Sequence, residues 1–270
     1  MEAINRRIWR SAEVLRWYGR LEGYIDGGER RCFEELHNQV RDQPVLDLGV
    51  GGGRTTALLL EVTRAYVGLD LTPEMVATCR RKFPDVRVDE GDARDLSRFA
   101  DGSFQLVVFS YNGIDLVHDH GRDSVLREVH RVLRPGGAFY FSTIHRDGPD
   151  FREPPQRQPL PRANPLRLAT RAARRSAGRA LGLIRRARYG RYEERRDGHS
   201  VLLHQALDYG LLVYATTIAE LRGQLTETGY GPVKIVGAKS GKPILDGQAD
   251  DEPYFHVIAR KLGVGSPDLG

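Results

Sequence analysis

Short apolar runs alternate with segments of helical periodicity in two stretches of the chain. Apolar runs bounded by turn residues are typical of buried strands, and apolar positions three or four residues apart predict helices. The predicted strands are 45–48, 65–69, 86–88, 104–110, 138–144, 233–236 and 254–259. The predicted helices are 55–62, 73–82, 122–133 and 217–228. Strands that alternate with helices favour an α/β fold with a doubly wound, mostly parallel sheet.

Two parts of the chain fall outside this alternation. The first 43 residues have helical periodicity in two pieces, which predicts an N-terminal helical cap. Residues 146–205 begin with six prolines between Asp147 and Pro165 and continue as an arginine-rich helix over 166–188. We expect a single domain over 1–262, with a cap (1–43), a lid insertion (146–205) and a flexible tail (263–270).

Composition narrows the class of protein. The chain has 270 residues and two cysteines, too few for a disulfide framework. No stretch approaches the roughly 20 consecutive apolar residues of a membrane span. The charged N-terminal segment lacks the apolar centre of a signal peptide. We therefore predict a cytoplasmic protein without a transmembrane segment.

Four glycines stand among the five residues Gly49–Gly53, directly after the first predicted strand. Glycine accepts positive φ and lets the backbone approach a ligand, and ligands of doubly wound sheets bind at the carboxyl ends of the strands. A dinucleotide fingerprint would have glycine where Arg54 stands. Asp47 would repel a pyrophosphate but can accept hydrogen bonds from an ammonium group or from the N–H groups of the loop. The loop therefore favours a nucleoside cofactor that carries a cation.

The segment VLDLGVGGGR resembles the first motif of class I S-adenosylmethionine-dependent methyltransferases, with Asp47, Gly49, Gly51 and Gly53 at its fixed positions. GLDLTPEMV, EGDARDL, DGSFQLVVFSYNGID, HRVLRPGGAFYFS and TIAELRGQLTETGYGPVKIVG resemble the segments that follow it, in order. The resemblance covers about 45–144 and 216–261, outside the basic insertion. It implies a seven-stranded class I fold with S-adenosyl-L-methionine as cofactor and S-adenosyl-L-homocysteine as product.

The resemblance also implies roles for individual residues. Asp70 would bind the ribose hydroxyls, Asp92 would face the adenine amino group, and Ala93 would lie on the adenine ring. The other expected cofactor contacts are Leu71, Met75, Ser110 and Tyr111, with Tyr18 and Tyr24 as aromatic caps and Arg30 as partner of the cofactor's carboxylate. For the two capping tyrosines and Arg30, simple helix packing and a solvent-exposed face are the alternative interpretation.

Methyl transfer needs a nucleophile aligned behind the methyl group, and a hydroxyl or ammonium acceptor also needs a base. His145 follows the fifth predicted strand and is the candidate base, with a purely structural role as the alternative. His118 and His120, close to Asp115 and Asp119, raise a metal site as a hypothesis. A polar surface loop explains these four residues more simply, and we predict no metal.

The basic charge is concentrated in the insertion. Residues 151–196 hold 14 arginines and three acidic residues, although the whole chain has a net charge of only +5. The segment could be a solvated lid, a grip for an anionic or polar small substrate, a membrane-surface helix or a nucleic-acid docking element. Nucleic acid is less favoured because no aromatic residue interleaves with the arginines before Tyr189.

The sequence thus predicts a methyltransferase that modifies an oxygen or nitrogen of a small or modular metabolite, with oxygen slightly favoured. Ser110–Gly113 reads SYNG rather than the N/D-P-P-Y/F motif of many enzymes that methylate planar nitrogens. One alternative is an RNA- or protein-directed methyltransferase docked by residues 151–196. Another is a non-catalytic partner subunit with the cofactor-binding fold. The sequence leaves the acceptor and the oligomeric state open.

Overall fold

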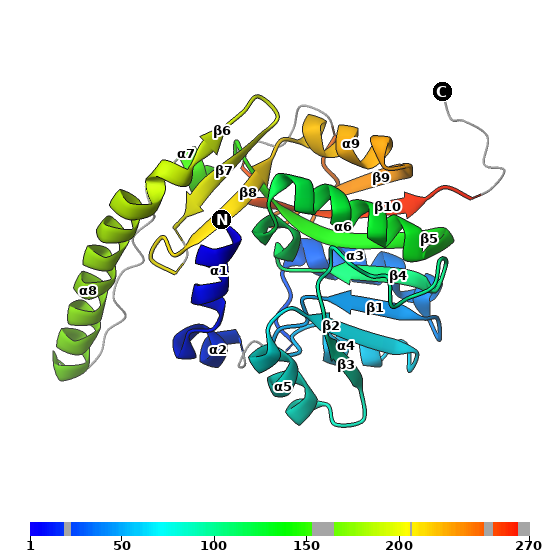
Figure 1. Cartoon of the computed structure of the whole chain (residues 1–270), viewed down its shortest axis with the longest axis horizontal. Helices are drawn as coiled ribbons and strands as arrows, with labels where there is room; N and C mark the ends of the chain where they lie inside the picture. Colours follow the sequence, from blue (N-terminus) through cyan, green and yellow to red (C-terminus); the bar gives the residue numbers. More distant parts are fainter. Residues whose placement is uncertain (19–22, 153–164, 206, 246–250, 264–270) are drawn as a thin grey trace.

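The structure is a computed structural model that describes residues 1–18, 23–152, 165–205, 207–245 and 251–263. A central sheet carries helices on both faces, and further elements extend from one end of it (Figure 1). The helices are α1 (Glu2–Trp9), α2 (Ala12–Tyr18), α3 (Gly27–Val40), α4 (Thr56–Leu60), α5 (Pro73–Lys82), η1 (Gly113–Leu116), α6 (Asp119–Val132), α7 (Pro149–Arg152), α8 (Pro165–Tyr189), η2 (Gly190–Tyr192) and α9 (Ile218–Glu227). The strands are β1 (Val45–Leu48), β2 (Tyr66–Asp70), β3 (Arg87–Glu90), β4 (Phe104–Phe109), β5 (Leu133–His145), β6 (Glu194–Arg195), β7 (His199–His204), β8 (Leu211–Thr216), β9 (Tyr230–Gly237) and β10 (Tyr254–Lys261).

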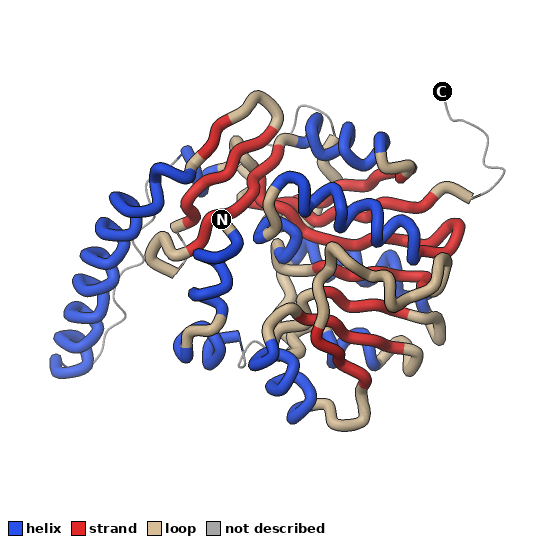
Figure 2. Tube along the Cα trace, in the orientation of Figure 1, coloured by secondary structure: helices blue, strands red, loops and turns tan. Residues whose placement is uncertain are grey.

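The sheet has the predicted doubly wound topology. Strands β3, β2, β1, β4 and β5 are parallel neighbours in that order, and β10 pairs antiparallel with both β5 and β9. Figure 2 shows these strands as one layer with helices packed on its faces. In this arrangement the carboxyl ends of β1, β2 and β4 meet at one edge, where a ligand site is expected. The prediction of an α/β fold with a mostly parallel sheet is confirmed.

The sheet forks at the carboxyl end of β5, which the sequence did not predict. There β5 pairs with β8 at Ile144 and His145, and β8 continues antiparallel into β7 and β6. The hairpin of β7 and β8 was missed because its connection carries no Asn-Gly or Asp-Gly turn signal. Instead Leu207, Asp208 and Tyr209 all adopt positive φ, between 51° and 57°. The predicted insertion, 146–205, therefore ends with β7, which pairs with β8 just beyond it in a hairpin that enlarges the sheet.

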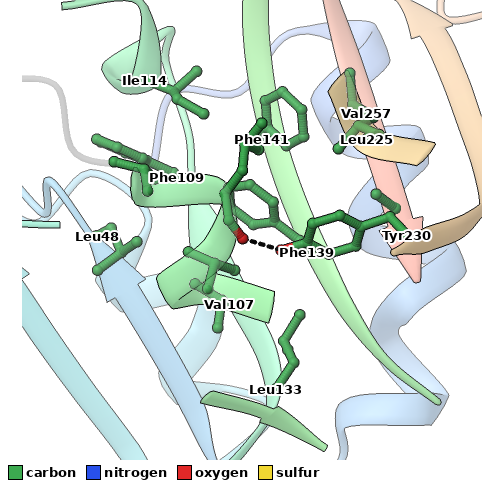
Figure 3. Packing of buried hydrophobic residues seen from close by; sticks show 14 of the residues in the cluster. Leu48, Val107, Phe109, Ile114, Leu133, Phe139, Phe141, Leu225, Tyr230 and Val257 are labelled. Atoms are coloured by element: carbon green, nitrogen blue, oxygen red, sulfur yellow. Dashed lines mark hydrogen bonds between the residues drawn. The ribbon is translucent and has the colours of Figure 1, made fainter. Parts of the chain in front are cut away.

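The main core lies between the sheet and the helices α6 and α9 (Figure 3). Phe139 and Phe141 on β5 have ring centroids 4.6 Å apart, and Tyr230 packs beside Phe139. Tyr230 stands where the resemblance leads us to expect Phe, and its hydroxyl donates to the Leu126 carbonyl at 3.0 Å. A buried hydroxyl is tolerated only with such a partner, so this bond explains why tyrosine fits here.

The start of β5 differs from the prediction. Pro135-Gly136-Gly137 was expected to separate a helix from a strand that begins at residue 138. In the structure α6 ends at Val132 and β5 already begins at Leu133, so the Pro-Gly-Gly segment lies inside the strand. Gly136 has φ +77°, and the register against β4 shifts between Phe104 and Leu106. The glycine thus bends the strand without ending it.

The predicted N-terminal cap divides into two parts. Helix α1 packs on β8, where the Asn5 side chain donates to the Leu212 carbonyl at 2.8 Å and accepts from its N–H at 3.0 Å. Helix α3 lies against β9 and β10, away from α1. Its Gly28 is essential for this packing because a Cβ there would lie 2.5 Å from the His256 ring.

Among the helices of the described residues, none combines the length and the apolar character that a membrane span requires. The prolines of 153–164 and nearly all of the predicted tail, 264–270, lie outside the described residues.

Candidate functional site

A cavity of about 350 Å³ opens at the carboxyl ends of β1, β2, β3 and β4. Its floor is the glycine loop and the strand ends, and the N-terminal helices close it from the other side. The predicted cofactor residues that line it are Gly49, Gly51, Asp70, Leu71, Met75, Asp92, Ala93, Ser110, Tyr111 and Tyr18. The predicted residues Asp47, Gly53, Tyr24, Arg30 and His145 are not among its lining residues. Most of the contacts that the resemblance implies therefore meet in one cavity.

The glycines of the loop have different tasks. Gly51 has φ +55°, and a Cβ there would find its nearest neighbour, the Gly49 carbonyl, only at 4.0 Å. Its backbone thus faces open space in the cavity, where a ligand can approach closely. Gly53 has φ +83°, but a Cβ there would lie 2.5 Å from the Phe83 ring. The third glycine is required for packing against α5, and it does not contact the cavity.

Asp47 supports the loop from behind. Its carboxylate is fully buried and accepts hydrogen bonds from the hydroxyls of Thr55 and Tyr66, both at 2.9 Å, through one oxygen. The other oxygen, Oδ1, has no hydrogen-bond partner among the described residues. Burial raises the pKa of Asp47 to about 7, although the two hydroxyls oppose that shift. The sequence placed Asp47 beside the ligand, whereas the structure surrounds it with side-chain hydroxyls under the loop.

This raised pKa predicts a pH-dependent stability that Asp47→Asn abolishes. The folded protein keeps the proton on Asp47 up to about pH 7, whereas the unfolded chain loses it near 3.8. The unfolded state therefore binds fewer protons in this window, and the contribution of Asp47 to the free energy of unfolding falls as pH rises from about 4 to about 7. Urea unfolding at pH 4.5, 6 and 8 should show the free energy of unfolding of the wild type falling relative to that of Asp47→Asn as pH rises. An equal difference at all three pH values would contradict the assignment, and exposed Glu61→Gln serves as the control.

Asp70 ends β2 and is the best-placed acceptor in the cavity. Its two oxygens accept from the N–H groups of Gly51 and Thr72, each at 2.8 Å. Burial raises the pKa of this carboxyl, and the two backbone donors counteract the shift. Each carboxylate oxygen can accept more than one hydrogen bond, so ligand hydroxyls can be added to this pattern. Asp70 thus holds the glycine loop and faces the cavity with the same carboxylate.

Asp92, after β3, is held by a neighbour that the motif does not include. Arg94 donates to both oxygens of Asp92, and the shortest contact is 2.5 Å. Partial burial would raise the pKa of Asp92, but the hydrogen bonds and charge of Arg94 lower it below its usual value. The carboxylate is therefore ionised and fixed at the cavity wall, beside Ala93.

A buried ion pair next to the glycine loop was missed by the sequence interpretation. Arg54, read as the residue that breaks a dinucleotide fingerprint, donates to both oxygens of Glu29 on α3, at 2.6 and 2.7 Å. It also donates to the Ser110 hydroxyl at 2.8 Å, and its guanidinium lies 4.9 Å from the Tyr111 ring centroid. One arginine thus connects α3, the glycine loop and the end of β4. The one sequence feature that pointed to this ion pair is the arginine directly after the glycines, at position 54.

Aromatic side chains form the wall opposite the glycine loop. Trp9 and Tyr18 have ring centroids 4.7 Å apart, and Tyr18 lies 6.0 Å from Tyr111. Burial raises the pKa of both tyrosines, so their phenols stay neutral near pH 7. Tyr24 is 54% exposed, and the Arg30 side chain is also exposed. The structure therefore places Tyr18 at the cavity, but it places Tyr24 and Arg30 at the surface.

His145, the predicted base, is buried away from the cavity. Its ring lies 4.6 Å from the Phe255 ring, and its Nδ1 is 3.1 Å from the Glu252 carbonyl oxygen. The position after β5 was inferred correctly, but β8 and β10 both flank β5 there and enclose the side chain. This placement favours the structural role, because a base must be within hydrogen-bond reach of the proton that it removes.

We therefore expect His145→Asn to slow methyl transfer less than about tenfold, whereas removing a general base typically lowers the rate by about 10²–10⁴-fold. The same variant should lose about 1 kcal/mol of unfolding free energy with its buried hydrogen bond. The measurement is the initial rate of label transfer from methyl-labelled cofactor, after a thermal melt has shown that the variant is folded. A loss beyond a hundredfold in the folded variant would restore His145 as the base.

The hypothesis of a metal in the loop after β4 is not supported. Asp115 points inward, where it accepts from Arg122 at 2.9 Å, from the Thr143 hydroxyl at 2.6 Å and from the Ile144 N–H at 2.7 Å. His118 and His120 have ring centroids 6.2 Å apart, and the side chain of Asp119 lies outside the described part. Over the side chains that the structure describes, no three His, Cys, Asp or Glu residues are grouped to hold a metal ion. Asp115 therefore serves as the internal partner of Arg122.

Comparison with known proteins agrees with this geometry. A family model described as "Methyltransferase domain" matches residues 45–137. The arsenite methyltransferase of Aquipseudomonas alcaligenes is 39% identical over 117 residues, which are 38% of this chain and 33% of that protein. The demethylmenaquinone methyltransferase of Chlorobaculum parvum is 38% identical over 102 residues, 37% of this chain and 41% of that protein. The chain thus spans less than half the length of these two relatives.

Solved structures extend the likeness to the whole fold. An S-adenosylmethionine-dependent methyltransferase from Mesorhizobium loti aligns with a TM-score of 0.56 at 22% identity, over 87% of this chain and 98% of that one. The 1,6-didemethyltoxoflavin-N1-methyltransferase of Burkholderia thailandensis, solved with S-adenosylhomocysteine bound, aligns with a TM-score of 0.52 at 18% identity, over 97% and 84% of the two chains. At such identities the likeness shows the fold alone. Residues 45–137 therefore match a methyltransferase domain, and the sheet has the fold of class I S-adenosylmethionine-dependent methyltransferases.

Proposed function

We propose that the chain transfers the methyl group of S-adenosylmethionine to a small molecule, with oxygen slightly favoured over nitrogen as the acceptor atom. The observation that carries the proposal is the cavity of about 350 Å³ in which the glycine loop, Asp70 and Asp92 meet under an aromatic wall. This volume lies within the range of small-molecule binding sites. When bound, the cofactor supplies an activated methyl group on a sulfonium.

The residues present fit this cofactor. Gly51 leaves open space where a side chain would otherwise stand, and Asp70 can accept from the paired hydroxyls of a ribose. Asp92, ionised and held by Arg94, can accept from the amino group of an adenine. The unpartnered Oδ1 of Asp47 lies under the loop, and a cationic ligand nearby would favour the ionised form of this carboxyl. We therefore assign binding of the nucleoside to Asp70 and Asp92.

The other residues of the cavity orient the acceptor and exclude water. Trp9, Tyr18 and Tyr111 form an apolar wall whose phenols remain protonated, so they can donate hydrogen bonds but are poor bases. Arg6 of α1 and Arg10 directly after it line the same cavity. Arg10 is paired with Glu74 at 3.1 Å, so the charge of Arg6 is the one that favours an anionic or polar acceptor. Alignment inside a water-excluding cavity is the main contribution that such a site makes to methyl transfer.

The relatives support a small acceptor. The names of the first two specify arsenite and demethylmenaquinone as what those proteins methylate, and a third, from Methylococcus capsulatus, is named ubiquinone biosynthesis O-methyltransferase. We keep the RNA- or protein-directed methyltransferase and the non-catalytic subunit as alternatives. The cytoplasm remains the expected compartment, since both cysteines are free and buried in the structure.

The test is label transfer from methyl-labelled S-adenosylmethionine into a cell extract fractionated into small molecules, lipids, nucleic acid and protein. The proposal predicts label in the small-molecule or lipid fraction, and clearly less label with Asp70→Ala at a cofactor concentration below the wild-type Kd. Label confined to nucleic acid or protein would replace the proposal with the macromolecule-directed alternative. Tight cofactor binding without transfer to any fraction would favour the non-catalytic subunit.

A further inference from the structure

Helix α8 contacts the rest of the protein along one narrow side. It is 25 residues long and stands at the flank of the molecule, apart from the main sheet (Figure 1). A Cβ at Gly178 would lie 3.0 Å from the Asp208 carboxylate, and one at Gly182 would lie 3.2 Å from the Tyr209 ring. Arg185, on the same side, donates to the Leu207 carbonyl at 2.5 Å. Arg186 lies 5.0 Å from the Tyr209 ring centroid, and Tyr189 at the end of the helix packs on the hydrophobic cluster of β7 and β8. The packing side is thus made mainly of small residues, arginine side chains and one tyrosine.

The opposite side of the helix is apolar and exposed. At 100° per residue, one group of residues lies more than 120° from the middle of the side that carries Gly178, Gly182 and Arg185. Among the side chains that the structure describes, the apolar members of this group are Ala173, Ala180, Leu183, Ile184 and Ala187, which we call the outer face, and Ser176 lies among them. Leu183 is 68% exposed and Ile184 is 63% exposed. Helices of soluble domains normally turn such side chains toward the core, whereas here the small residues face the core. In α8 the large apolar side chains therefore face solvent, and the small residues face the rest of the protein.

Arginines flank the outer face on both sides. Arg179 and Arg186 lie along one edge and Arg188 along the other, and all three are exposed. Over its whole length the α8 segment contains eight arginines and no acidic residue. An apolar strip between two basic edges is the pattern of helices that lie in the plane of a membrane surface.

We propose that α8 docks on an anionic phospholipid bilayer, with the outer face at the headgroup boundary and the flanking arginines on lipid phosphates. Charge complementarity selects the anionic surface, because each arginine near it strengthens binding. Nucleic acid would also attract the arginines, but its charged phosphate backbone offers no apolar surface that could cover exposed Leu183 and Ile184. This docking rests on α8 alone. Combined with the proposed function, it assigns the methyl acceptor to the lipid-soluble small molecules.

The test is co-sedimentation of the full chain with sucrose-loaded vesicles of phosphatidylcholine alone or with one third phosphatidylglycerol. We expect the partition coefficient to be at least about tenfold higher on the anionic vesicles and to fall steeply as salt increases. The measurement needs neither cofactor nor methyl acceptor, so its failure is distinguishable from failure of the proposed function.

Two sets of variants separate the apolar and the charged contributions. The double variant Leu183→Ser, Ile184→Ser should lower the anionic partition coefficient by about tenfold, while Leu245→Ser, at a site 65% exposed elsewhere, should leave it unchanged. Replacing Arg179, Arg186 and Arg188 with Gln should lower it by more than about tenfold, while exposed Arg64→Gln and Arg127→Gln should have little effect.

Two outcomes would overturn the proposal. Equal partition of wild type and the Leu183, Ile184 double variant would show that the outer face does not touch lipid. Absence of vesicle binding, together with RNA binding that the double variant retains in full, would identify α8 as a nucleic-acid element. Thermal melts of all variants establish that they are folded, which the exposure of the substituted side chains leads us to expect.

Discussion

Arg54→Met is expected to destabilise the protein by about 3–5 kcal/mol, because it leaves the buried Glu29 carboxylate without its partner. The side chains of Arg54 and Glu29 are only 7% and 2% exposed, and two short hydrogen bonds join them. An uncompensated charge at that depth cannot be screened by water. The measurement is the free energy of unfolding from urea titrations at neutral pH.

The controls for Arg54 separate the ion pair from simple loss of volume. The double variant Arg54→Met, Glu29→Leu removes both charges and should recover a large part of the lost stability. Arg31→Met breaks an exposed pair with Glu34 on the same helix and should change the free energy of unfolding by less than about 1 kcal/mol. A loss for Arg54→Met as small as that for Arg31→Met would contradict the role given to this pair.

Asp70→Ala is expected to weaken binding of S-adenosylhomocysteine by about tenfold to a hundredfold, which corresponds to roughly 1–3 kcal/mol from lost charge-assisted hydrogen bonds. Two effects combine in this variant. The ribose hydroxyls lose their acceptor, and the Gly51 N–H loses the carboxylate that fixes the glycine loop. The measurement is calorimetric titration of the purified chain.

Two further variants define what the Asp70 result means. Asp70→Asn keeps one acceptor oxygen and should bind with intermediate affinity. Asp85→Ala removes an exposed acid from the segment before β3 and should bind like the wild type. If Asp70→Ala, shown to be folded, kept the wild-type affinity, Asp70 would not be a cofactor ligand.

The elements that the sequence predicted well are those whose signals are local. The apolar run at 104–110 became β4, and Pro73 marks the first residue of α5 as its ring geometry favours. The hairpin of β7 and β8 was missed because its connection depends on positive φ at three residues without turn signatures. For α8 the sequence predicted the helix but not the side on which it packs, since Gly178 and Gly182 pack and Ile184 is exposed.

In the site, too, residues within local motifs were predicted, whereas contacts between distant segments of the chain were not. The motif positions Gly51, Asp70 and Asp92 line the cavity, since each lies at or just after the end of its strand. The partner of Arg54 stands 25 residues earlier on a helix from the N-terminal segment, and no local pattern encodes such a contact. His145 is the last residue of β5, close to where the sequence predicted it, but the pairing of β8 and β10 with β5, which encloses the side chain, is evident only from the structure. Tertiary pairing therefore decides what the motifs leave open.

The central claim is that this cavity holds the cofactor of the family, and a crystal structure of the chain with S-adenosylhomocysteine tests it most directly. The account predicts the ribose hydroxyls within hydrogen-bond distance of the Asp70 carboxylate, the adenine between Asp92 and Ala93, and the amino-acid end close to Gly51. A nucleoside bound without contact to Asp70, or outside the cavity under Trp9 and Tyr18, would contradict the account.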